Sequence, residues 1–143
     1  MSAPHAGSWS CDFARDDGTG GFVRLELRPD DGTAWYWAYL VGPDTGLIVV
    51  RDHEVPLPRA GLEIRTDGLW AELICETPGE HWSFGLEAFG VRFDDEAEAA
   101  TSDRGERVAV GFDLEWETPD RVFGELLLGR RRIEFDGRGT FMT

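Results

Sequence analysis

Lysine, asparagine and glutamine are absent from this 143-residue sequence, and arginine supplies all 14 basic residues. This bias is typical of a GC-rich coding sequence and indicates no function. Cys11 and Cys75 belong to no CxxC pair or Cys/His cluster, which argues against a structural zinc site and favours free thiols in a cytoplasmic protein. No apolar run approaches the ~20 residues that span a bilayer. Residues 1–10 also lack the basic and apolar segments of a signal peptide.

Basic charge is scarce as well: 28 acidic residues give a formal net charge of −14. Such a surface repels a phosphate backbone, so we expect no nucleic-acid partner. The acidity keeps an aromatic-rich chain soluble, and 12% aromatic residues argue against disorder. Glycine-rich phosphate motifs are missing, so no cofactor is expected. The length suits one domain with one core, so we expect a single domain over residues 1–143, with a flexible segment at 1–7 and an acidic loop at 94–106.

Helical periodicity is nearly absent, and 18 glycines and seven prolines interrupt stretches that alternate with period two. Asp67-Gly68, between two such stretches, is a two-residue hairpin signal. The pattern predicts an all-β, lipocalin-like antiparallel β-barrel of about 8–10 strands with little or no helix, the alternative being a two-sheet sandwich. The expected strands are residues 8–13, 21–28, 33–41, 47–52, 62–66, 69–76, 81–93 (bent at Gly90), 107–117, 121–128 and 131–135.

Residues 33–41 are apolar on both faces of the expected strand. Trp35, Trp37 and Tyr39 alternate with Tyr36 and other apolar residues. We expect such a strand to be covered on both sides, by a filled barrel interior on one and by a subunit contact or flanking segment on the other.

Aromatic residues are the best candidates for a ligand-contacting wall, because indole and phenol rings bury large areas and can stabilise a developing cation. A barrel of this size can hold one small ligand. The alternative is a packed core with no cavity. The candidate substrate-binding residues are Trp35, Trp37, Tyr39, Trp70, Trp82, Phe84, Phe112 and Trp116.

Acids in otherwise apolar strands are the candidate catalytic groups. A carboxyl group in an apolar pocket has a raised pKa and can donate a proton near neutral pH. Glu72 shares a face with Trp70 and Ile74, so either it is buried or they are exposed. We select Glu72, His81 and Asp113 as candidate catalytic residues. The same acids can equally alternate outward into water. No metal site is expected, because adjacent residues of Asp52-His53-Glu54 point to opposite faces.

Several long motifs resemble a known group of proteins over residues 20–137. They are Gly21-Phe22-Val23-Arg24-Leu25, Trp35-Tyr36-Trp37-Ala38-Tyr39-Leu40, Asp52-His53-Glu54-Val55-Pro56-Leu57-Pro58, Asp67-Gly68-Leu69-Trp70, Cys75-Glu76-Thr77-Pro78, His81-Trp82, Glu87-Ala88-Phe89-Gly90 and Asp113-Leu114-Glu115-Trp116-Glu117. This set resembles the amino-terminal half of a bacterial family whose relatives are similar to the carotenoid 1,2-hydratase (hydroxyneurosporene synthase) superfamily, with tandem lipocalin-like β-domains. Such relatives continue into a second β-domain past the position of Asp136-Gly137. A site between two domains would require a partner β-domain or a homodimer.

The resemblance implies chemistry on hydrophobic polyene, terpenoid or polyketide-like intermediates in natural-product biosynthesis. We therefore expect a cofactor-independent cyclase or isomerase, the pericyclase type included, or a hydratase, in which the aromatic wall orients the substrate. The alternatives are a non-catalytic binding protein for an apolar small molecule, and an interaction domain that pairs with a second β-domain.

Overall fold

The computed structural model describes residues 6–93 and 105–143, and it is built almost entirely of antiparallel strands. The strands are β1 (Gly7–Ala14), β2 (Gly20–Arg28), β3 (Thr33–Gly42), β4 (Gly46–Pro56), β5 (Leu62–Thr66), β6 (Leu69–Thr77), β7 (His81–Phe93), β8 (Glu106–Glu117), β9 (Arg121–Leu128), β10 (Arg131–Arg138) and β11 (Phe141–Met142). A single 3-10 turn, η1 (Pro29–Asp31), interrupts them in the described part of the chain. The all-β prediction is confirmed.

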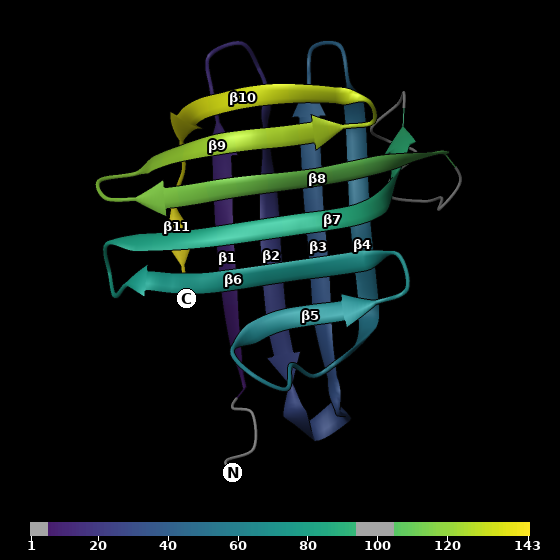
Figure 1. The fold of residues 1–143 in the computed structure, drawn as a ribbon, viewed down its shortest axis with the longest axis vertical. Helices are drawn as coiled ribbons and strands as arrows, with labels where there is room; N and C mark the ends of the chain where they lie inside the picture. Colours follow the sequence, from purple (N-terminus) through teal and green to yellow (C-terminus); the bar gives the residue numbers. More distant parts are fainter. Residues whose placement is uncertain (1–5, 94–104) are drawn as a thin grey trace.

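Eight strands close into a ring in the order β4-β3-β2-β1-β10-β9-β8-β7, and β7 pairs back with β4. The ring is flattened into two layers whose strands cross (Figure 1). We call β1–β4 the back layer and β5–β10 the front layer. Crossing strands are typical of orthogonal sheet packing, in which the layers join at corners. The architecture is therefore barrel-like.

The ring closes at two corners by short pairings. At one corner β7 leaves the front layer and pairs with β4 through three residue pairs, Leu47 with Phe93, Ile48 with Arg92 and Val49 with Val91. The predicted bend at Gly90 lies beside this corner, where a Cβ atom would stand 3.1 Å from the Val49 carbonyl oxygen. At the other corner β1 and β10 share one pair, Ala14 with Arg138.

Local sequence signals account for most strand boundaries. Asp67-Gly68 forms the predicted two-residue turn between β5 and β6, with Thr66 opposite Leu69 and Gly68 at a φ of 78°. The flexible segment and acidic loop predicted at 1–7 and 94–106 lie largely outside the described residues, although β1 already begins at Gly7 and β8 at Glu106. None of the described residues forms a helix of the length and apolarity needed to cross a membrane.

The inner faces of the two layers pack directly on one another. Phe13 from β1 lies 5.4 Å from Phe135, 6.2 Å from Phe112 and 6.5 Å from Phe84, measured between ring centroids. These distances are in the range of favourable aromatic pairs. Tyr36 is fully buried in the same core, and its hydroxyl has no hydrogen-bond partner among the described groups. Burial raises the pKa of Tyr36.

We expect Phe13→Ala to destabilise the fold by about 3–5 kcal/mol, because it empties the contact between three other rings. Urea denaturation followed by circular dichroism measures the change in the free energy of unfolding. Phe123→Ala is the matched control, because Phe123 lies half-buried on the outer face under the Arg121 guanidinium. Equal losses in the two variants would contradict the packing described here.

The two cysteines are free and differ in burial: Cys11 lies in the core and Cys75 is exposed. Burial raises the pKa of Cys11 to about 12, and the charge of Asp12 contributes in the same direction. A thiol reacts as its thiolate. We expect one thiol to react rapidly with a disulfide reagent at pH 8 in the native protein, and a second only after denaturation. Two fast thiols in the native state would contradict this assignment.

Candidate functional site

The structure divides the predicted aromatic wall among three places. Trp82, Phe84, Phe112 and Trp116 face the interior, Trp35, Trp37 and Tyr39 lie on the outer face of the back layer, and Trp70 lies on the outer face of the front layer. The eight residues therefore do not line one common pocket.

The inward-facing tryptophans hold the end of the described chain. Trp82 stacks on Phe141 of β11 with ring centroids 4.6 Å apart, and Trp116 lies 5.7 Å from the same ring. The Trp116 Nε1–H donates a hydrogen bond to the Gly139 carbonyl oxygen at 3.2 Å. These contacts fix β11 against the core.

Trp35, on the outer face of β3, lies between two groups from neighbouring strands. The Arg28 guanidinium of β2 is 4.2 Å from its ring centroid, and the His53 imidazole of β4 stacks on it at 4.5 Å. A bulge between Ala34 and Tyr36 brings His53 to this position. Trp37 carries Arg24 in the same way at 5.5 Å.

Side chains of β2 and β4 cover the outer face of β3, where the sequence predicted a subunit contact or a flanking segment. Its outer rings are half-buried under side chains of β2 and β4. The large exposed apolar side chains among the described residues are Ile74, Phe89 and Met142, and none of them belongs to β3. A subunit contact is therefore not needed to cover this strand, and the homodimer stays a prediction.

The three candidate catalytic residues all lie on the front layer and do not meet. Glu72 and Asp113 are on its outer face, in register with Gly85, which separates them. Ile74, on the face of Glu72, is 42% exposed, so that face points to solvent. His81 is the first residue of β7 and forms a 2.8 Å hydrogen bond with Glu115. No group of three or more His, Cys, Asp or Glu side chains within residues 6–93 and 105–143 is placed to hold a metal ion.

A groove crosses the outer face of the front layer, and we call it the front groove. It has two connected parts, of about 840 Å³ and about 340 Å³, which share Trp70, Glu87 and Leu127. The larger part runs from Pro56 and the β5–β6 turn to Phe89 and Ala109. The smaller part continues over Gly85, Gly111, Asp113 and Glu125 to Arg132.

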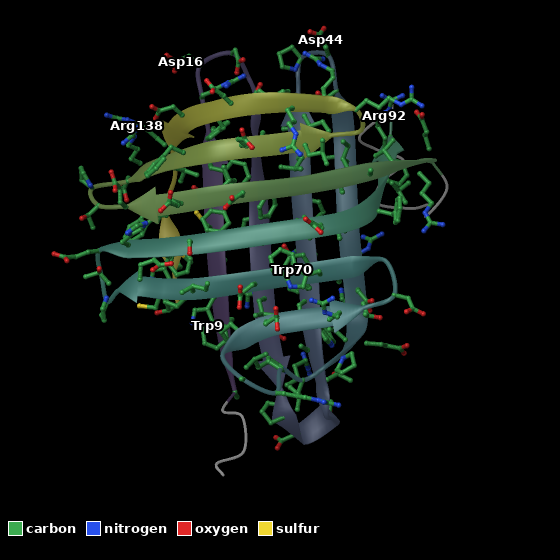
Figure 2. All side chains as sticks on the ribbon, in the orientation of Figure 1. Trp9, Asp16, Asp44, Trp70, Arg92 and Arg138 are labelled. Atoms are coloured by element: carbon green, nitrogen blue, oxygen red, sulfur yellow. The ribbon has the colours of Figure 1, made fainter. Side chains whose placement is uncertain are left out.

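Two glycines form the floor of the front groove. A Cβ atom at Gly85 would stand 3.1 Å from two carbons of the Trp70 indole, so the absent side chain lets this ring lie against the sheet. A Cβ atom at Gly111 would stand 2.5 Å from the Leu86 carbonyl oxygen. Figure 2 shows Trp70 against the middle of the front layer.

Polar contacts orient the walls of the groove. The Trp70 Nε1–H donates to a Glu63 carboxylate oxygen at 3.0 Å, which fixes the rotation of the indole. Phe89 is 55% exposed, and the Arg107 guanidinium lies 4.5 Å from its centroid. The groove therefore offers two aromatic surfaces, one held by a hydrogen bond and one carrying a cation.

Trp70, Phe112 and Asp113 are the predicted site residues that line the groove, although the Phe112 side chain is buried in the core. Sequence reasoning missed Phe89 and Leu127, and it took Gly85 and Gly111 as ordinary strand positions. A signal was available, because a glycine within a strand marks a close approach of other atoms. Gly85 and Gly111 both stand at positions that alternate outward.

A family model described as a domain of unknown function (DUF7064) matches residues 3–140. The chain belongs to that family. No curated protein and no solved structure gives a significant match to this DUF7064 chain. The resemblance to the carotenoid 1,2-hydratase superfamily and its lipocalin-like domains stays a prediction.

The glycine floor gives a prediction that needs no ligand. We expect Gly111→Ala to cost about 1–3 kcal/mol, because its methyl group would overlap the backbone of β7. Gly85→Ala should cost less, because the added methyl group would meet the far edge of the Trp70 side chain and not backbone, and displacement of the ring should shift the Trp70 indole N–H resonance in an NMR spectrum. Trp70→Phe assigns that resonance. An unchanged resonance in Gly85→Ala would show that the indole does not lie on Gly85.

Proposed function

We propose that this DUF7064 domain is a binding module that holds a small organic molecule with a flat apolar portion in the front groove. The observation that carries the proposal is the Trp70 indole, seated on Gly85 and held by Glu63 at the centre of the groove. A ring fixed in this way presents a ready-made surface, so little side-chain freedom is lost when a ligand stacks on it.

The dimensions of the front groove support this proposal. Its larger part, about 840 Å³, lies within the range of small-molecule sites, about 300–1,000 Å³. Leu127 and Ala109 add apolar surface, and Glu87 adds an acceptor that can orient a ligand. Apolar walls with a few polar groups are the usual composition of such sites.

The interior of the ring is filled by side chains, which favours a binding site on an outer face. The rings of Phe13, Phe84 and Phe112 contact one another where the predicted barrel pocket would lie. The front groove, by contrast, is open without any rearrangement of the core. This favours the outer face over the interior as the place where a ligand is held.

Catalysis in the same groove is the second candidate function, and the position of Asp113 favours it. Asp113 was selected from the sequence as a catalytic acid, and it lines the groove together with Trp70 and Glu87. A cyclase, isomerase or hydratase would use one of these carboxyl groups to move a proton on a substrate held against the indole. Binding needs only the groove and its fixed indole, whereas catalysis also needs a carboxyl group that moves a proton. We therefore prefer binding.

The test is an NMR titration of the ¹⁵N-labelled protein with 4-phenylbutan-1-ol, a neutral probe with a flat apolar end. Weak binding, with a Kd on the order of 1 mM, is expected for a probe of this size. The amide signals of Trp70, Glu87 and Phe89 should shift. Trp70→Ala should weaken binding about tenfold, whereas Phe123→Ala, outside the groove on the same face, should leave it unchanged.

Other outcomes would overturn the proposal. Shifts confined to Phe13, Tyr36 and Phe112 would place the probe inside the ring. Shifts confined to Trp35 and Trp37 would place it on the back layer. No shift up to the solubility limit of the probe would show that the groove does not bind apolar molecules. Recovery of a chemically altered probe would favour the catalytic candidate.

A further inference from the structure

The charges around the front groove are unbalanced. Four acids line it, Asp67, Glu87, Asp113 and Glu125, against two arginines, Arg65 and Arg132. Arg132 pairs with Glu125 at 3.3 Å. In the described part of the chain, neither Glu87 nor Asp113 forms an ion pair with an arginine or histidine. Some acids elsewhere on the surface do form such pairs, as Glu26 does with Arg24 and Arg28 at 3.1 and 3.0 Å. The groove therefore carries an excess of negative charge.

Sheet register places these carboxylates close together. Asp113 stands directly opposite Glu125, and like charges in directly opposed positions are destabilising. Glu87 stands opposite Gly111, and Asp113 stands opposite Gly85. Each unpaired carboxylate thus has an empty glycine position beside it, over the floor that Trp70 partly covers.

An aromatic ring beside carboxylates is the environment that binds organic cations. A cation over an indole face gains from the ring quadrupole, and nearby carboxylates add Coulomb attraction. Phe89, at the rim of the same groove, already holds the Arg107 guanidinium at 4.5 Å. The net charge of −14 raises the local concentration of cations around the whole protein.

We propose that the front groove selects an organic cation, an ammonium group attached to an apolar body. The apolar body lies on Trp70 and Leu127, and the ammonium group lies between Glu87 and Asp113. This inference rests on the proposed binding function and adds the charge of the ligand to it. A neutral or anionic ligand of the same shape would leave the two carboxylates without a partner.

The test compares three probes with the same apolar body: 4-phenylbutylamine, 4-phenylbutan-1-ol and 4-phenylbutyrate. Kd values come from NMR titrations at low salt. The amine should bind about tenfold more tightly than the alcohol, from two partly screened ion pairs, and the carboxylate should bind most weakly. Added salt should reduce the advantage of the amine. In the double variant Glu87→Gln/Asp113→Asn, the amine should bind no more tightly than the alcohol binds to the same variant.

Glu134→Gln is the matched control, because Glu134 is an exposed acid on the outer face of β10 that does not line the groove. It should leave all three Kd values unchanged. Equal affinity for the three probes, or tightest binding of the carboxylate, would overturn the charge inference and leave the groove as a binding site. Amine shifts spread over the acidic surface and insensitive to the double variant would also overturn it. Failure of all three probes would overturn the proposed function itself.

Discussion

The burial of two apolar inner faces against one another is the constraint on which the rest of this molecule depends. Phe13 from the back layer contacts Phe84, Phe112 and Phe135 from three strands of the front layer. Because these rings join both layers, they hold the crossing arrangement although the corners are closed by only a few residue pairs. The same rings fill the interior. Recognition is therefore expected on an outer face.

The two outer faces are finished in different ways. On the back layer, rings of β3 are stacked with arginine and histidine from adjacent strands, and Glu26 forms ion pairs with two of these arginines. Cation–π contacts of this kind are worth about 0.5–1 kcal/mol each at exposed sites. On the front layer, by contrast, two glycines leave a groove, and acids without an ion pair line part of it. A face whose aromatic and charged side chains contact one another thus lies on one side of the core, and a face with an open groove lies on the other.

Glycine determines where the front groove lies. A glycine inside a strand costs stability, because it has no side chain to pack and more backbone freedom to lose. At Gly85 the indole of Trp70 covers the vacant position, which recovers part of the lost burial. The glycines of the groove therefore lower local stability but leave surface accessible to a ligand. They lie on strands that pack against the phenylalanine core.

Period-two alternation and turn residues by themselves determined the all-β class, the ten long strands and the Asp67-Gly68 hairpin, because these depend on local backbone geometry. The two-residue β11 escaped prediction, since it exists only through pairing with β1 and packing on Trp82. For β3, alternation could not decide between the faces of Trp35 and Tyr36, because both are apolar. Tertiary packing placed Tyr36 inside. Tertiary packing likewise placed Trp70 and Asp113 together in one groove. They lie on β6 and β8, and the register between these strands is set by the turns and by the core.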